Sequence, residues 1–394
     1  MDWESSLDAV QDARPAAQIP TRVVVRSAVV MFLARLGSLN ALEQSGSSAF
    51  WRKWTGRELP SADTIGRVCA QVDISGLRRI GRQIYARLKR GKALMPPAHG
   101  LMAAILDGHE LHATYRHRCP GCLTRRIETR HGTQVQYYHR HVTLQLVGRD
   151  LTLLLDAEPI RPGEGEVTAA IRLLDRVLED YPRAFDVVLG DALYANSIFF
   201  NHVSSRGKHA LAVLKNEERV LWEDAQSLFA EMQPELTRRD RWDATCWDLE
   251  GFTTWPQVGQ PVRVVQSHER TTVRRQLNGQ EEPLEAHWAW VTTLPQERAS
   301  TRAVLELGHR RWAIENEGFN ELSTRQHGDH VYRHHEQAML AFLLLAMICC
   351  NVFMAFYCRD LKPQLRRRVS MLHVSRLVAA ELYQTCAGPQ LVPT

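Results

Sequence analysis

Residues 185–196 read FDVVLGDALYAN, a short apolar run that ends at an aspartate, Asp191. Such a run is typical of a buried strand. Upstream, residues 101–108 (LMAAILDG) show the same pattern and end at Asp107. The two aspartates are therefore expected at the ends of two buried strands, where a sheet would hold them in fixed, neighbouring positions.

A third acid, Glu315, lies far downstream in a helical pattern, HRRWAIENEGFNEL (residues 309–322). Carboxylate oxygens are the ligands that hard cations such as Mg²⁺ prefer. Two such ions can clamp the attacking and leaving oxygens of a phosphodiester, and clustered carboxylates are tolerable only with cations between them. The three acids predict a two-metal site for phosphodiester chemistry. For each acid taken alone, a solvated or salt-bridged side chain is the alternative.

The order of elements between these acids favours a mixed α/β sheet. Residues 137–160 read as two strands joined by a turn at residues 148–150, and residues 166–182 as an amphipathic helix. After Asp191, strands and helices alternate up to residue 235. Strands that are first antiparallel and then alternate with helices fit a sheet covered on both faces. Residues 236–298 hold five of the ten tryptophans and are expected to form a β-rich insertion.

The N-terminal region of this chain of 394 residues reads as helices. Residues 26–44 have helical apolar spacing, and Ser61 is expected to cap the next helix. The net charge is only +5, but residues 78–92 hold seven Arg or Lys and no acid. Such a cluster fits a phosphate-binding surface, and a solvated helix face is the alternative. The candidate DNA-binding residues here are Arg78, Arg79, Arg82, Arg87 and Lys89.

Residues 338–357 form an uncharged apolar run of about the length that spans a bilayer. A helix that is apolar all round is also found in the centre of a large soluble core. We favour the buried helix, because Asn351 and two cysteines interrupt the run. No signal peptide is visible at the polar, acidic N-terminus. A cytoplasmic protein without a membrane partner is therefore expected, and the membrane protein remains the alternative.

Cys119-Pro-Gly-Cys122 has the spacing of a zinc knuckle. Zinc needs two more ligands, and several histidines are near in sequence: His109, His112, His117, His131, His139 and His141. A structural zinc ion is one interpretation. Reduced thiols in a loop and redox chemistry are the alternatives.

Three further groups of side chains are candidates for contact with DNA. Arg311 lies one turn before Glu315, where it would hold a phosphate or orient the glutamate. Lys215 and Asn216 end a strand, where lysine suits a backbone phosphate, and a surface lysine is the alternative. Trp255 belongs to the tryptophan-rich segment and would stack on an unpaired base, with packing of the β-rich segment as the alternative.

The phrases DGHEL, GDALYAN, LKNEER and RWAIENEGFNEL, in this order, resemble the insertion-sequence-four-like bacterial transposases with a DDE motif. Those proteins carry a β-rich insertion before the glutamate and a motif of Tyr, two residues, Arg, three residues, Glu, six residues and Lys. Arg311 and Glu315 match this motif. Gly308 stands in place of the tyrosine and Leu322 in place of the lysine.

The resemblance implies a ribonuclease H-like fold, a mixed five-stranded sheet flanked by helices. The implied domains are a disordered lead-in (1–19), a helical DNA-binding region (20–95), a catalytic domain (100–235 and 299–357), the β-rich insertion (236–298) and a basic tail (358–394).

The activity implied is cleavage of transposon ends and joining of the freed 3′-hydroxyl to target DNA. Asp107 would bridge two Mg²⁺ or Mn²⁺ ions, and Asp191 and Glu315 would each complete one site. Double-stranded DNA with terminal inverted repeats would be bound by a homodimer near the bacterial nucleoid. A metal-dependent nuclease on the same fold and an inactive, domesticated DNA-binding protein are the alternatives.

Overall fold

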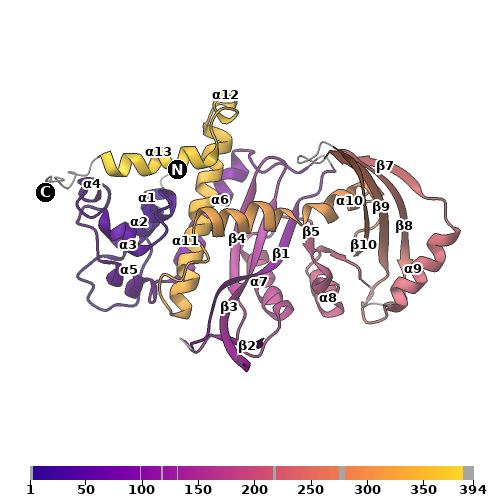
Figure 1. Ribbon diagram of the computed structural model, residues 1–394, viewed down its shortest axis with the longest axis horizontal. Helices are drawn as coiled ribbons and strands as arrows, with labels where there is room; N and C mark the ends of the chain where they lie inside the picture. Colours follow the sequence, from indigo (N-terminus) through magenta and orange to yellow (C-terminus); the bar gives the residue numbers. More distant parts are fainter. Residues whose placement is uncertain are drawn as a thin grey trace. The chain divides into compact units, whose positions relative to one another are not determined.

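A computed structural model describes residues 3–97, 99–116, 119–130, 132–215, 219–274 and 280–384. The chain forms two compact units. The first unit comprises residues 1–95, 108–182 and 315–394, and the second comprises residues 96–107 and 183–314. Figure 1 labels the elements of both.

The N-terminal part of the first unit is helical, as expected. Its helices are α1 (Trp3–Asp8), α2 (Thr21–Leu33), α3 (Leu39–Gln44), α4 (Phe50–Thr55), α5 (Ala62–Cys69) and α6 (Ile74–Arg90). The side chain of Ser61 accepts a hydrogen bond from the Thr64 N–H at 3.3 Å, which confirms the predicted cap. The helical run 26–44 is broken because Arg35 and Gly37 have positive φ angles of 53° and 77°.

The segment 1–19 differs from the expected disordered lead-in. It contains α1, and the side chains of Leu7 and Val10 are 0% and 3% exposed. Two apolar residues in a polar segment are enough to fix it, because they are buried with the other helices of the unit.

A β-region follows in the first unit. Strand β1 (Ala103–Thr114) belongs to this unit from Gly108 onward, and it is joined by β2 (Leu123–Thr129), β3 (Gly132–Val147) and β4 (Thr152–Pro159). The order is β2-β3-β1, with β4 also paired antiparallel to β3. The Gly148 N–H donates to the Leu151 carbonyl at 3.0 Å, which confirms the predicted turn. Helix α7 (Glu166–Asp180) packs on β3 and β4 as expected.

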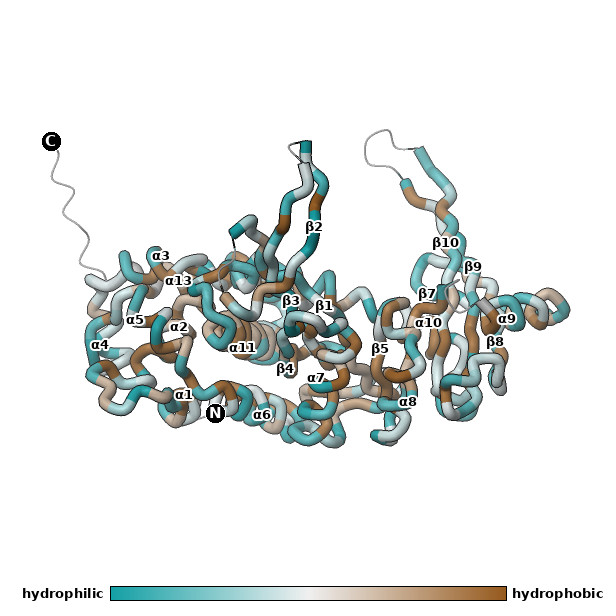
Figure 2. The backbone as a smooth tube through the Cα atoms, turned by 90° about the horizontal axis from the view of Figure 1, so that it is seen from below, coloured by the Kyte–Doolittle hydropathy of each residue, from teal (hydrophilic) through white to brown (hydrophobic). Residues whose placement is uncertain are grey.

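The apolar run forms α11 (Glu336–Ala355), which contacts β4, α6 and α2. Figure 2 shows it as a brown segment beside β4. By length and composition the helix could cross a membrane, but 72% of the apolar stretch is buried in the protein. It is therefore a core helix of this unit, as we favoured.

The C-terminal segment 358–384 also contains more structure than the expected basic tail. It forms α12 (Pro363–Arg366) and α13 (Met371–Gln384) after a π-helical turn, η4 (Phe356–Asp360). Helix α13 contacts α2, and the side chains of Val374 and Leu382 are 8% and 2% exposed. These apolar residues attach the segment to the helical core despite its charge.

The second unit is a mixed sheet with helices. Along the chain it contains β1 up to Asp107, β5 (Val187–Gly190), a 3₁₀ turn η1 (Ala192–Tyr194), α8 (Ser197–Ser205), β6 (His209–Val213), α9 (Arg219–Glu231), β7 (Glu235–Arg239), β8 (Trp242–Phe252), β9 (Val262–Arg274), β10 (Glu281–Thr292) and α10 (Thr301–Arg310). The strand order is β1-β5-β6-β10-β9-β8-β7. Strands β1, β5 and β6 are parallel, and the remaining pairs are antiparallel.

The expected β-rich segment, residues 236–298, provides β8, β9, β10 and most of β7. Strand β10 pairs with β6 through Trp290 and Val213, so the inserted strands continue the sheet of the second unit. The sheet is therefore longer than the five strands we expected.

A buried ionic network ties α10 to β9. Glu269 is 2% exposed and accepts hydrogen bonds from His309 at 2.6 Å, Ser267 at 2.8 Å and Arg239 at 3.2 Å. Burial alone would raise the pKa of Glu269, but these donors outweigh burial and hold its pKa below the ordinary value of 4.5. The carboxylate is thus ionised and paired within the fold.

Candidate functional site

Asp107 and Asp191 lie on neighbouring parallel strands of the second unit. The parallel pairing runs to Ile105 of β1 and Leu189 of β5, each two residues before one of the aspartates. Neighbouring strands are about 4.8 Å apart, and both aspartates are half-buried. Strand placement is confirmed, with one difference: β1 continues beyond Asp107 to Thr114. The two aspartates therefore belong to neighbouring parallel strands, close to the end of β5.

The backbone after β5 fixes Asp191. Its Oδ1 accepts a hydrogen bond from the Leu193 N–H at 2.9 Å and caps η1. A Cβ at Gly190 would lie 2.5 Å from the Cβ of Tyr194, which is fully buried. Because residue 190 is glycine, the chain can turn closely over Tyr194 directly after β5, at the point where Asp191 lies.

Glu315 lies in a π-helical segment at the start of the last part of the first unit. We expected a helical pattern over residues 309–322, but α10 ends at Arg310 and two π-helical segments follow, η2 (Ile314–Phe319) and η3 (Glu321–Arg325). Wide turns of this kind are rare and are frequent at functional sites.

Packing within the first unit accounts for the position of η2. A Cβ at Gly318 would lie 2.1 Å from the Oε1 of Gln145 in β3, so the segment approaches this side chain closely. The Phe319 ring stacks on His109 of β1 with centroids 4.6 Å apart. His109 is two residues beyond Asp107 in the chain. The half-buried Glu315 is therefore carried by a segment that packs on β1.

The two departures from the family motif are both explained by packing. A Cβ at Gly308 would lie 2.3 Å from the indole Nε1 of Trp290, and Trp290 is 1% exposed. No larger side chain fits at 308 without moving a core tryptophan. Leu322 is 3% exposed within the first unit, where a lysine would bury its charge.

The other proposed DNA contacts lie in different environments. Arg311 is 6% exposed, and its guanidinium carbon lies 4.2 Å from the centre of the Trp312 ring. Lys215 is exposed just after β6, and Asn216 lies outside the described residues. Trp255 is 5% exposed and packs on Phe200 with ring centroids 5.2 Å apart, which is the packing role we named as its alternative. Their contact with DNA stays a prediction.

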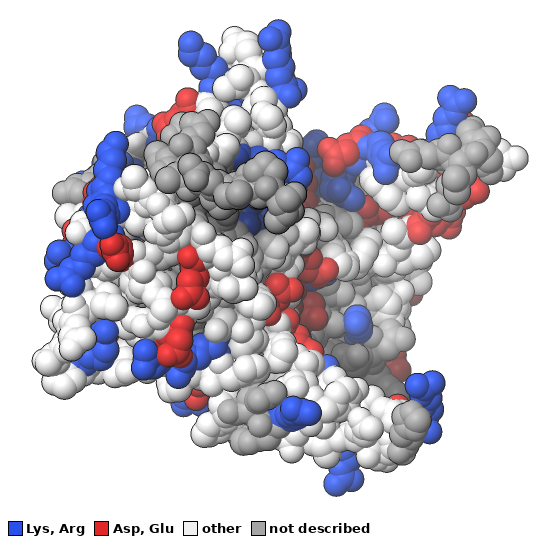
Figure 3. Space-filling view, turned by 60° about the vertical axis from the view of Figure 1, so that its left-hand side comes forward, with Lys and Arg blue, Asp and Glu red and all other residues white. Residues whose placement is uncertain are grey.

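The basic residues of α6 divide into two groups. Arg78 and Arg82 face acids: Arg78 donates to Asp156 at 3.0 Å, and Arg82 donates to Asp180 at 2.6 Å. Arg79, Arg87 and Lys89 are exposed. On the face of the molecule that Figure 3 shows, the coloured Lys and Arg side chains occur in separate groups interspersed with acids. The exposed group is the better placed for a phosphate, and its role stays a prediction.

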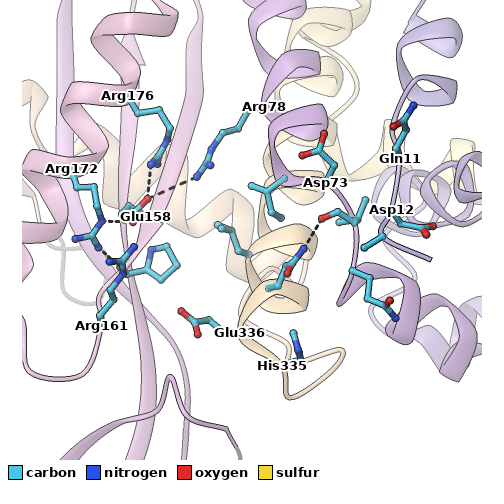
Figure 4. A pocket seen from close by; sticks show the side chains of 17 residues that line it. Gln11, Asp12, Asp73, Arg78, Glu158, Arg161, Arg172, Arg176, His335 and Glu336 are labelled. Atoms are coloured by element: carbon cyan, nitrogen blue, oxygen red, sulfur yellow. Dashed lines mark hydrogen bonds and ion pairs between the residues drawn. The ribbon is translucent and has the colours of Figure 1, made fainter. Parts of the chain in front are cut away.

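An ionic network that sequence reasoning missed borders a cavity of about 890 Å³ in the first unit. Figure 4 shows Arg78, Arg172 and Arg176 directed at Glu158 on β4. Glu158 is 5% exposed, and the Arg176 guanidinium lies 2.7 Å from it. These arginines have carboxylate partners, so the network fixes α6 and α7 to β4. The only sequence signal was an arginine pair one turn apart on α7.

The predicted Cys119–Cys122 knuckle acquires a third member, His139 of β3. The His139 Nε2 lies 3.2 Å from the Cys119 sulfur and 3.4 Å from the Cys122 sulfur, and the two sulfurs are 3.8 Å apart. All three side chains are buried. Burial raises the pKa of Cys119 to about 11 and lowers that of His139 to about 4. His117 and His131, also named above, lie outside the described residues.

Comparison with known proteins gives one family assignment. A comparison with curated proteins found no matching sequence. The family described as "Transposase DDE domain" matches residues 102–352, which include Asp107, Asp191 and Glu315. This match covers more than half of the chain, and the mixed sheet agrees with it. The protein therefore belongs to the family of transposases with a DDE domain.

Proposed function

We propose that this protein is the transposase of a bacterial insertion sequence, of the insertion-sequence-four-like group. It cleaves the ends of its element and joins the freed 3′-hydroxyl to target DNA. The observation that carries this proposal is the parallel pairing of β1 with β5 within the matched domain, which supports neighbouring positions for Asp107 and Asp191. A sheet is a rigid support for a catalytic pair of this kind.

The strand pairings support a ribonuclease H-like catalytic core. Within the first unit β4 pairs antiparallel with β3, and β3 neighbours β1. Within the second unit β1, β5 and β6 are parallel neighbours. The inserted strands of the second unit begin only after β6.

The donor set fits a pair of Mg²⁺ or Mn²⁺ ions, because all three acids offer carboxylate oxygen. Asp107 would contact both ions, and Asp191 and Glu315 would each hold one. When bound, such ions stabilise the charge that develops on the attacking and leaving oxygens. The chain's own part is positioning: the strands hold two carboxylates, the η1 cap orients Asp191, and η2 carries Glu315.

The partners proposed are terminal inverted repeats and target DNA, both double-stranded, bound by a homodimer in the bacterial cytoplasm at the nucleoid. Arg311, Lys215, Asn216, Trp255 and the exposed cations of α6 are the proposed contacts. Phosphate contacts would fix the position of the DNA without reading its sequence. Binding that depends on them should weaken steeply with salt.

Substitution of Asp191 by Asn tests the catalytic assignment. The variant removes one carboxylate charge at constant size, so it should bind labelled element ends with unchanged affinity. Cleavage with Mg²⁺ should fall by more than about 100-fold, since even an outer partner of a metal ligand contributes about 10–100-fold. The control is Glu179→Gln, which neutralises an exposed acid of α7.

Persistent Mg²⁺-dependent cleavage by Asp191→Asn would refute the assignment. A second reaction separates a transposase from a nuclease on the same fold. The purified protein, given pre-cut ends and a supercoiled plasmid, should join the ends to the plasmid. Cleavage without joining would favour the nuclease, and specific binding without either reaction would favour the inactive DNA-binding protein.

A further inference from the structure

The first unit contains a cluster of two thiols and an imidazole, Cys119, Cys122 and His139. None of the three is one of the acids Asp107, Asp191 and Glu315, and the cluster has no part in the proposed reaction. It begins with a turn, Cys119-Pro120-Gly121-Cys122, which is closed by a hydrogen bond from the Cys122 N–H to the Cys119 carbonyl at 3.2 Å. Proline and glycine at the centre of such a turn are favoured by its backbone angles. The turn brings both sulfurs to one side.

The third member comes from the strand that pairs with the segment after the turn. Leu123 of β2 pairs with Tyr138 of β3, so Cys122 and His139 are the next residues along the same ladder. Side chains of such opposite residues lie on the same face of a sheet. The register of the β2–β3 hairpin therefore brings the imidazole to the two sulfurs.

The separations within the cluster are those of a tetrahedral zinc site. With Zn–S bonds of about 2.3 Å and Zn–N bonds of about 2.0 Å, tetrahedral ligands lie about 3.8 Å apart for two sulfurs and about 3.5 Å for sulfur and nitrogen. The observed separations are 3.8 Å between the sulfurs and 3.2 and 3.4 Å from sulfur to nitrogen. A disulfide would need an S–S distance of about 2.0 Å, so these two sulfurs are not bonded.

The cluster also has an exposed carboxylate neighbour, Glu336, which would supply a fourth ligand after its side chain turns toward the three ligand atoms. A Cβ built on Gly121 would lie 3.1 Å from the Cδ and Oε2 of Glu336. The Glu336 carboxylate, at the start of α11, therefore lies against the turn that carries both sulfurs. Carboxylate oxygen is an accepted zinc ligand at about 2.0–2.2 Å.

We propose that Cys119, Cys122 and His139 bind one structural zinc ion and that Glu336 completes its tetrahedron. The ion would join the base of the β2–β3 hairpin to the start of the core helix α11. Closed four-ligand sites of this kind are structural. The role differs from that of the three acids, which offer only oxygen and would hold hard cations.

The zinc content of the full-length protein tests the proposal. Protein purified with a non-thiol reductant and without chelator should contain one zinc per chain by elemental analysis. Cys119→Ser and His139→Gln should each lower this content to a small fraction. Cys246→Ser is the matched control, since Cys246 is also a buried free cysteine but belongs to the second unit; it should keep one zinc.

Two further measurements cover variants that fail to fold and separate this site from the acids. Wild-type protein stripped of metal and given Co²⁺ should show the charge-transfer absorption of thiolate ligands. Asp107→Asn should retain one zinc, so the zinc result stands or falls independently of the proposed activity.

A wild-type protein that is purified without zinc and takes up neither Zn²⁺ nor Co²⁺ would overturn the proposal. Equal loss of zinc in Cys246→Ser would also overturn it, since loss would then not be specific to the cluster. Glu336→Gln should lower the affinity for zinc; unchanged affinity in that variant would overturn its role as the fourth ligand.

Discussion

Substitution of Asn351 by leucine tests why a polar residue lies in the most apolar helix of the chain. Asn351 is 5% exposed within α11. Its Oδ1 accepts from the Leu154 N–H at 2.9 Å, and its Nδ2 donates to the Leu154 carbonyl at 2.7 Å. Among the described strands, β4 pairs only with β3. The amide of Asn351 thus takes the place of a neighbouring strand at a buried edge.

Two opposing contributions determine whether Asn351→Leu lowers or raises the free energy of unfolding. Loss of both hydrogen bonds leaves two buried backbone groups unsatisfied, at about 1–3 kcal/mol each, or about 2–6 kcal/mol together. Burial of a leucine side chain contributes about 1.5–3 kcal/mol in the other direction. We expect Asn351→Leu to be net destabilising by about 2 kcal/mol. Hydrophobicity alone predicts the opposite sign.

The assay combines urea unfolding of the purified protein with hydrogen–deuterium exchange of a peptide that contains Leu154. The variant should shift the unfolding midpoint to lower urea and should speed exchange at Leu154. Met347→Leu, one turn earlier on α11 and 2% exposed, conserves volume and is the control. An Asn351→Leu protein that is as stable as the wild type or more stable would refute the reasoning.

Three further outcomes are expected. Glu321→Gln removes the buried carboxylate that lies 2.7 Å from Arg35 and should cost about 3–5 kcal/mol in urea unfolding; a loss below about 1 kcal/mol would contradict this. Gly308→Ala should destabilise by about 1–3 kcal/mol through overlap with the buried Trp290, against a gain of about 1 kcal/mol from helix propensity alone; a higher melting temperature would show that Trp290 moves. The depressed pKa of Glu269 contributes stability that is present above pH 4.5 and lost as the pH falls through the lower folded value; Glu269→Gln should flatten this part of the stability–pH curve, and an unchanged slope would exclude the carboxylate.

Short apolar runs were enough to predict the elements that hold the two aspartates. The runs before Asp107 and Asp191 are strands β1 and β5, which pair in parallel; strands β2 to β4 and helix α7 connect them. Local signals also succeeded at Ser61, where a hydroxyl precedes an apolar period. These features depend on neighbouring residues, which a sequence displays directly.

Long-range partners could not be predicted in the same way. The π-helical segment around Glu315 packs at Gly318 against Gln145, a residue far earlier in the chain. The pairing of Arg78 with Asp156 likewise joins distant segments, so the basic face of α6 looked uniform in the sequence. His139 was one of six histidines near the cysteines, and only the hairpin register selects it.

Long-range packing also explains the two residues near Glu315 that depart from the family motif. In the sequence, Gly308 and Leu322 stand in the places of the tyrosine and the lysine of the motif. In the structure Gly308 is the one residue type that fits against Trp290, and Leu322 is buried in the first unit. Because both positions have a packing role, restoring the motif by Gly308→Tyr or Leu322→Lys would damage the fold before it could improve DNA binding. Packing therefore accounts for both departures, and they carry no argument against catalysis by the three acids.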